Sequence, residues 1–292
     1  MTFNEDARSG GSKVSRRGRN TAIGVGGGGL AVIILAIASQ FLGFDLTGLA
    51  PIFSGEQNQS QSGSPLENCQ TGADANANVD CRMDFAGQSL DRYWADTLPQ
   101  FGVTYRTTTI NIFSGQIDSG CGAASSAMGP FYCPADEQIY LDTSFYETLR
   151  TQFGASGGPL AEMYVLAHEW GHHIQNISGI MNGLNLRDSG PRSDGVRLEL
   201  QADCFAGAWV GAASTIKDAN GVTFLEPVTR EQIAQALSAA SAVGDDHIQA
   251  STQGQVTPET WTHGSSEQRQ QWFVTGYNGG PNSCDTFASG AL

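Results

Sequence analysis

The feature that most constrains this chain is the run AHEWGHHIQ at residues 167–175, which holds three of the five histidines in the 292-residue sequence. Residues 160–178 are predicted to be helical, and Pro159 suits the first turn, where a missing N–H costs no helical hydrogen bond. On this helix His168 and His172 are four residues apart, so they lie about 40° apart on one face. Two imidazoles placed in this way can bind a single zinc ion.

Glu169 flanks the same face, at about 60° from His172, where it can reach a water on the metal without binding the metal itself. The pattern H-E-x-x-H therefore predicts two zinc ligands and a general base. Zinc lowers the pKa of a bound water toward about 7, and the glutamate takes the proton as hydroxide attacks a carbonyl. The alternative is that these side chains lie on a solvated helix surface.

A catalytic zinc site needs a third protein ligand and an open position. The extended pattern H-E-x-x-H-x-x-G-x-x-H would require glycine at 175 and histidine at 178, whereas the chain has Gln175 and Ser178. That class is excluded, so the third ligand has to come from another part of the chain.

A second predicted helix, at about 194–216, offers such a ligand, because Glu199 and Asp203 share a face at four-residue spacing. We expect Glu199 to bind zinc and Asp203 to accept the spare N–H of a ligand histidine, which fixes its tautomer. The competing interpretation is a solvated acidic face. Weaker alternatives for the third ligand are Asp188, Asp194 and His263.

His263 lies just before a predicted helix that contains Arg269. A donor close to the developing oxyanion would speed amide hydrolysis, and His263 is the candidate; the alternative is a plain loop histidine. Arg269 could equally hold a carboxylate structurally. His173 falls about 100° from His172 and is expected to miss the metal, and His247 has little in its favour.

Residues 20–44 are uncharged and largely apolar, long enough as a helix to cross a bilayer of about 30 Å. The basic cluster before them predicts a cytoplasmic tail at 1–20 and a membrane anchor at 21–44, which would make this a single-pass cell-membrane protein. The rival is a signal peptide cleaved near Ala36-Ile37-Ala38, which would give a secreted protein. Both interpretations export the rest of the chain.

All six cysteines follow this segment, an even number that is typical of disulfides in an oxidising compartment. Six cysteines allow 15 pairings, and free buried thiols are the alternative. Proximity in the sequence favours Cys69–Cys81 and Cys121–Cys133, which leaves Cys204–Cys284 as the third pair.

Residues 45–68 are rich in Gly, Ser, Gln and Asn and predict a flexible linker before a domain at 69–292. Short strands are expected at 107–115 and 137–143, with a glycine-bearing loop between Cys121 and Cys133, and helices dominate the later sequence. The fold class is therefore α+β, mostly helical. A net charge of −14 makes nucleic acid an unsuitable partner.

The sequence resembles the neutral zinc metallopeptidases, bacterial membrane-anchored proteins with an H-E-x-G-H-H-x-Q signature. The resemblance extends from about 80 to 285 and rests on four blocks: 121–142, 167–175, 198–209 and 262–273. It implies a glutamate-zincin-like domain with a peptide or protein substrate. By this resemblance His168, His172 and Glu199 would bind Zn²⁺, and Glu169 would be the catalytic base. The competing class is a catalytically silent zinc domain that binds a protein or cell-wall partner.

Overall fold

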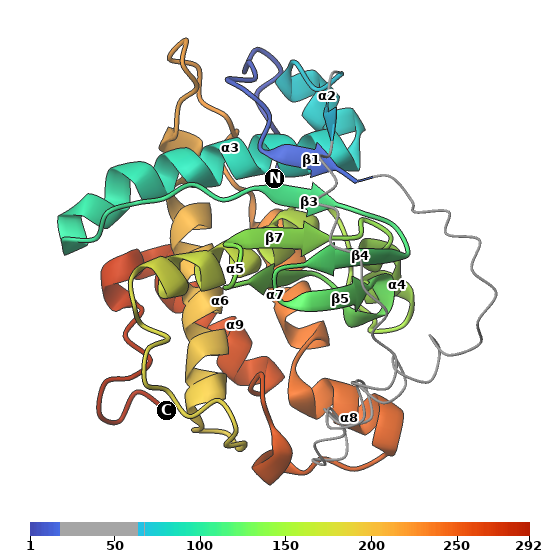
Figure 1. Cartoon of the computed structure of the whole chain (residues 1–292), viewed down its shortest axis with the longest axis vertical. Helices are drawn as coiled ribbons and strands as arrows, with labels where there is room; N and C mark the ends of the chain where they lie inside the picture. Colours follow the sequence, from blue (N-terminus) through green and yellow to red (C-terminus); the bar gives the residue numbers. More distant parts are fainter. Residues whose placement is uncertain (18–63, 67) are drawn as a thin grey trace.

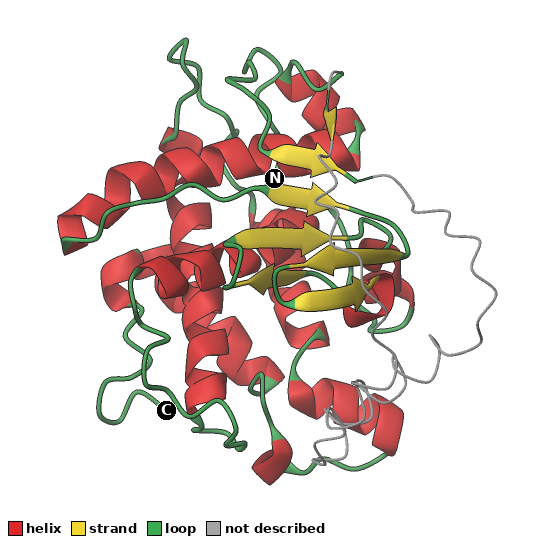
Figure 2. Cartoon of the chain, viewed as in Figure 1, coloured by secondary structure: helices red, strands yellow, loops and turns green. Residues whose placement is uncertain are grey.

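The computed structural model describes residues 1–17, 64–66 and 68–292. These residues form an α+β fold in which about half are helical, in agreement with the predicted class (Figures 1 and 2). The strands are β1 (Val14–Arg16), β2 (Ser64–Pro65), β3 (Ile110–Ile112), β4 (Gln116–Ser119), β5 (Gly122–Ser125), β6 (Phe131–Cys133) and β7 (Gln138–Leu141). The helices are α2 (Gly72–Ala77), α3 (Val79–Thr97), α4 (Phe145–Thr151), α5 (Pro159–Ile177), α6 (Asp194–Ala212), α7 (Arg230–Ala242), α8 (Asp245–Gln253) and α9 (Ser266–Gly279).

Within the described residues, five strands form a sheet in the order β2-β1-β3-β7-β6. The three central strands are parallel, and their register aligns Val14 with Ile110 and Ile110 with Ile139. The two outer strands, β2 and β6, run antiparallel to their neighbours. A separate hairpin, β4–β5, projects from this sheet and is visible in Figure 2. The aligned residues are all buried, as expected for the centre of a parallel sheet.

Four helices build the core that carries the site. α3 and α5 pack against the sheet, and α6 contacts both α5 and α9 in the next layer (Figure 1). Three of these helices each contribute a fully buried tryptophan to the core: Trp94 in α3, Trp170 in α5 and Trp209 in α6. The indole Nε1 of Trp209 donates to the Ser89 hydroxyl at 3.1 Å, which joins α6 to α3.

Three helices begin at residues whose side chains favour a helix start, and the first of them, at Pro159, was predicted. Pro159 occupies the first turn of α5. Thr229 and Ser265 each begin a helix with a capping box. The side chain of the cap residue accepts from the N–H of the glutamine three residues later, and the side chain of that glutamine accepts from the N–H of the cap residue. The segment between Cys121 and Cys133 differs from the predicted loop, because β5 and part of β6 lie within it.

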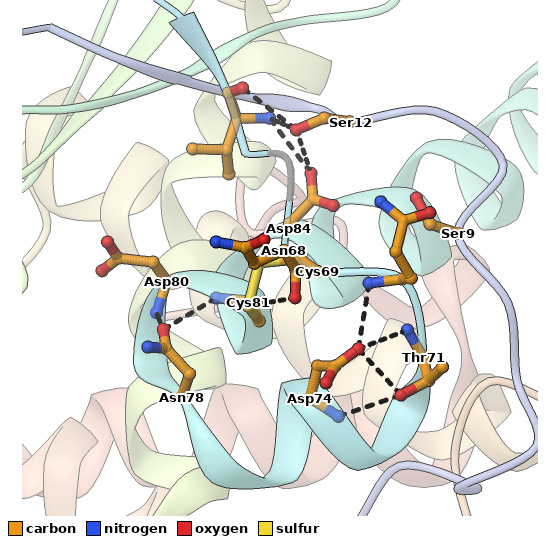
Figure 3. The surroundings of a disulfide bond; sticks show 12 residues. Ser9, Ser12, Asn68, Cys69, Thr71, Asp74, Asn78, Asp80, Cys81 and Asp84 are labelled. Atoms are coloured by element: carbon orange, nitrogen blue, oxygen red, sulfur yellow. Dashed lines mark hydrogen bonds between the residues drawn. A yellow bond between two sulfur atoms is a disulfide. The ribbon is translucent and has the colours of Figure 1, made fainter.

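The first residues of the chain are part of this domain. Phe3 is buried against Phe85, with ring centroids 5.7 Å apart, and it forms an isolated β-bridge with Leu225. The Asp84 carboxylate in α3 accepts hydrogen bonds from the Ser12 hydroxyl and from the N–H groups at positions 13 and 14, which fixes the start of β1 (Figure 3). Residues 1–17 are therefore held by both side-chain packing and backbone pairing.

The sequence predicted a separate cytoplasmic tail at 1–20, whereas β1 pairs with both β2 and β3, so residues 1–17 are part of the sheet-containing domain. Short strands flanked by charged residues give no periodic signal, so the sequence did not reveal β1. Helices long and apolar enough to cross a membrane are absent from the described residues. The predicted anchor at 21–44 and the linker up to residue 63 lie outside those residues.

The three disulfides confirm the predicted connectivity: Cys69–Cys81, Cys121–Cys133 and Cys204–Cys284. The first ties the segment before α2 to the first turn of α3 (Figure 3). The last joins α6 to the C-terminal segment across a sequence separation of 80 residues.

Candidate metal centre

Helix α5 carries the histidine run, and its close contact with α6 is made possible by a glycine. A Cβ atom on Gly171 would lie 2.9 Å from the Cα of Ala202 in α6, closer than real Cβ contacts come. The absence of a side chain at this position therefore lets the two helix backbones approach each other. This contact brings the face of α5 with His168 and His172 next to the face of α6 with Glu199.

The three side chains converge. The Nε2 atom of His168 lies 3.1 Å from Glu199 Oε2, and that of His172 lies 3.5 Å from Glu199 Oε1. Among the described residues, these three form a group that could hold a metal ion, with one donor atom from each lying within 4.8 Å of the others.

The donor set fits zinc in chemistry and in spacing. Two imidazoles and a carboxylate are ordinary zinc ligands at about 2.0–2.1 Å, and at a tetrahedral angle such bonds place ligand atoms about 3.3 Å apart. The two nitrogen–oxygen separations, 3.1 and 3.5 Å, bracket that spacing. His168, His172 and Glu199 could thus bind one zinc ion and leave a fourth position open.

A buried ion pair, Asp203 with Arg269, holds His168 at the ring nitrogen Nδ1. Asp203, one turn after Glu199 in α6, accepts from His168 Nδ1 at 2.9 Å and also from the Tyr164 hydroxyl. The Arg269 guanidinium of α9 binds both Asp203 oxygens, with Nε at 2.8 Å and a terminal nitrogen at 3.0 Å. A carboxylate on Nδ1 fixes the orientation of the ring, so that Nε2 is the His168 atom that faces the metal group.

The charged side chains of the site shift one another's pKa values. Burial alone would raise the pKa values of Glu199 and Asp203. The neighbouring imidazoles nevertheless hold the pKa of Glu199 well below its usual value, and Arg269 lowers the pKa of Asp203. Burial opposes protonation of His168, yet contact with Asp203 and Glu199 raises its pKa to about 10. Both carboxylates thus remain ionised at neutral pH, which favours a cation at the site.

Two further residues were predicted to take part in the chemistry, Glu169 and His263. Glu169 is buried on α5, 8% exposed, and follows His168 directly. His263 precedes α9, and its side chain is about half exposed. Partial desolvation opposes protonation of His263, but its hydrogen bond to Asp245 and the nearby charge of Glu199 raise its pKa. His263 therefore lies close enough to Glu199 to interact electrostatically with the site.

The remaining candidates are placed elsewhere. Asp188 is exposed, Asp194 accepts from the Asn185 N–H, and His247 bonds to the carbonyl of Phe153. None of these belongs to the metal-binding group found among the described residues. His173 is fully buried, with Nε2 2.7 Å from the Arg106 carbonyl and Nδ1 3.1 Å from the Tyr132 hydroxyl. It joins α5 to the sheet.

Sequence reasoning missed two residues near the site. Asp245 begins α8 and accepts from three successive backbone N–H groups, those of Thr262, His263 and Gly264, as well as contacting the His263 ring at 3.2 Å. Gln175 accepts from His172 Nδ1 at 2.9 Å. The contact between Asp245 and His263 joins the start of α8 to the loop before α9 across 18 residues, so no helical or strand spacing could indicate it. For Gln175 the three-residue spacing from His172 was an available signal.

Comparisons with known proteins identify the family of this chain. "Uncharacterized protein Rv2575" of Mycobacterium tuberculosis (strain ATCC 25618 / H37Rv) is 52% identical over 232 residues, which covers 79% of this chain and 78% of the relative. "Uncharacterized protein YpfJ" of Escherichia coli (strain K12) is 36% identical over 292 residues, which covers 97% of this chain and 94% of the relative. No solved structure matches the chain. The profile of the family described as "Putative neutral zinc metallopeptidase" matches residues 2–287, and the chain therefore belongs to that family.

Proposed function

We propose that the protein is a zinc-dependent endopeptidase that hydrolyses peptide bonds in peptide or protein substrates. The observation that carries this proposal is the convergence of His168, His172 and Glu199 from two helices, with a buried glutamate, Glu169, beside them. Family membership supports the same activity. Two imidazoles and one carboxylate leave the open position that a catalytic zinc site needs and a closed structural site lacks.

The roles of the chain's own residues follow from their positions. A zinc ion bound by the three ligands would supply Lewis acidity, making a coordinated water acidic near neutral pH and polarising a peptide carbonyl. Glu169 accepts the proton of the attacking water and passes it to the leaving amine. His263, held by Asp245, donates a hydrogen bond to the oxygen that gains negative charge. Asp203 and Arg269 keep His168 oriented.

We also propose that the domain works outside the cytoplasm. The three disulfides are typical of proteins that fold in an oxidising compartment. The net charge of −14 favours peptide substrates over nucleic acid, whose phosphates it would repel.

The decisive test is Glu169→Gln, which removes the proton acceptor but no proposed ligand. We expect zinc content to be unchanged and cleavage of a peptide library to fall by about 10²–10⁴-fold, the contribution of a positioned general base. Glu147→Gln is a suitable control, because that carboxylate lies in an exposed pair with Arg150 and should affect neither quantity. Equal hydrolysis by the Glu169 variant and the wild type would rule out the proposed mechanism.

Glu199→Ala tests the third ligand. We expect this variant to lose zinc, because two imidazoles alone leave the site incomplete. Stoichiometric zinc in Glu199→Ala would move the third ligand elsewhere. A wild-type protein that binds zinc but cleaves no peptide would instead favour the catalytically silent, partner-binding alternative.

A further inference from the structure

Gln175 is a fully buried amide in α5, three residues after the proposed zinc ligand His172. Its Oε1 lies 2.9 Å from His172 Nδ1, and its Nε2 lies 2.7 Å from the backbone carbonyl of Leu198 in α6. The side chain therefore connects one zinc-ligand candidate to the helix that supplies another.

The direction of these hydrogen bonds is fixed by the backbone carbonyl of Leu198. Because a backbone carbonyl can only accept, the amide nitrogen of Gln175 has to face Leu198 and its oxygen has to face His172. An amide oxygen in turn accepts only, so Nδ1 of His172 has to carry the proton. In the neutral ring the lone pair is then on Nε2, and it is this atom that lies 3.5 Å from Glu199.

A second glutamine supports the same orientation. Gln201 of α6 donates its Nε2 to the Cys284 carbonyl at 2.9 Å, so its Oε1 is turned toward Gln175 Nε2, 3.2 Å away. Cys284 is itself bonded to Cys204 in α6. Two backbone carbonyls thus set the polarity of a hydrogen-bonded chain that ends on the zinc-ligand candidate.

The two histidines are held differently. His168 faces a carboxylate, Asp203, whose charge is balanced by Arg269, whereas His172 faces a neutral amide. A neutral partner fixes the tautomer without adding a third buried negative charge next to Glu199 and Asp203.

We propose that Gln175, oriented by the Leu198 carbonyl and by Gln201, is a positioning residue that holds His172 in the Nδ1–H tautomer, ready to bind zinc through Nε2. This inference rests on the proposed metal site. Gln175 is buried and is not one of the proposed zinc ligands, and its contact with a proposed ligand is the hydrogen bond to His172.

The test compares zinc dissociation constants, measured by competition with a chromophoric chelator. Gln175→Met keeps a similar volume but has no strong acceptor, and we expect about 10- to 100-fold weaker zinc binding, the usual cost of losing a partner behind a metal ligand. Gln201→Leu should weaken binding less, because Leu198 still orients Gln175. Asn176→Leu is the matched control: its amide bonds to the Tyr132 hydroxyl, not to His172, and zinc affinity should be unchanged.

A second readout does not depend on any variant folding. In the zinc-loaded wild type, long-range ¹H–¹⁵N NMR should show the His172 proton on Nδ1. A proton on Nε2, or a Gln175→Met protein that binds zinc within about threefold of wild type, would overturn the inference. A wild-type protein that binds no zinc at all would instead refute the proposed metal site, so the two failures can be distinguished.

Discussion

At the scale of single residues, the buried histidines are constrained by what each ring nitrogen contacts. His168 and His172 each direct Nδ1 to an acceptor, and both leave Nε2 toward Glu199. Four-residue spacing was enough to predict that these groups share helix faces. It could not predict that the backbone carbonyl of Leu198 orients Gln175, because every residue carries the same carbonyl and sequence patterns do not distinguish one from another.

His173 provides a prediction about pH. Burial lowers the pKa of its imidazole, so the folded protein holds the neutral form more strongly than the unfolded chain does. The unfolded chain then binds more protons, and the associated stability is present above the unfolded pKa of about 6.5 and is lost as pH falls below it. In zinc-saturated protein, His173→Gln should lose less stability than wild type between pH 7.5 and 5.5. The difference is at most about 1.4 kcal/mol per pH unit.

The measurement is chemical denaturation at each pH, with the free energy of unfolding compared between the two proteins. His173→Gln is expected to be less stable overall, since the bond to the Arg106 carbonyl is disturbed. The change in the free energy of unfolding per pH unit is therefore the quantity to compare between the two proteins. Parallel slopes in variant and wild type would contradict a neutral buried imidazole at this position.

At the scale of elements, the site depends on how closely α6 and α9 approach each other. Three glycines line this contact, and a Cβ on Gly207 would lie 2.0 Å from the Phe273 carbonyl oxygen, while one on Gly276 would lie 1.8 Å from that of Cys204. This approach is what brings Arg269 to Asp203. The sequence predicted both helices through their periodicity and caps, but not their separation. The strand β5 was missed because its residues, Gly122–Ser125, have low β-propensity, and pairing with β4 imposes the strand.

Gly207→Ala tests this contact. Because the obstructing atom is backbone, the helices have to move apart, and we expect a loss of at least about 1–3 kcal/mol in the free energy of unfolding. Gly195→Ala in the same helix is the matched control, since its Cβ would meet its nearest neighbour at an ordinary 3.7 Å. That control should be neutral or stabilising by about 0.4–1 kcal/mol. Equal urea midpoints for the two variants would argue against the close approach.

At the scale of the whole molecule, the sheet and the core combine segments from both ends of the sequence. Composition identified the acidic, cysteine-paired domain, and its disulfide pattern was predicted correctly. The basic residues of the first 20 positions suggested a separate tail instead. What the composition could not convey is that Phe3 is buried against Phe85 and that β1 completes a parallel sheet with β3. Such pairings join distant segments, and only tertiary structure creates them.

Phe3→Ala measures how much this segment contributes. The side chain is fully buried, so its removal should lower the free energy of unfolding by about 3–5 kcal/mol, the range for deleting a buried aromatic ring. Glu5→Ala, at an exposed position nearby, should stay within about 0.5 kcal/mol of wild type. A Phe3→Ala protein as stable as Glu5→Ala would mean that the first residues do not pack on the domain in solution.

The placement of β1 also has a consequence for biosynthesis. Residues 1–17 are held by partners that the ribosome adds much later, since Phe3 pairs with Leu225 and β1 pairs with β3. Contacts between such distant segments slow folding, and they cannot form before the later segment has been made. The nascent chain must therefore keep residues 1–17 unpaired, and so accessible to chaperones, until the segment that contains Leu225 has been synthesised.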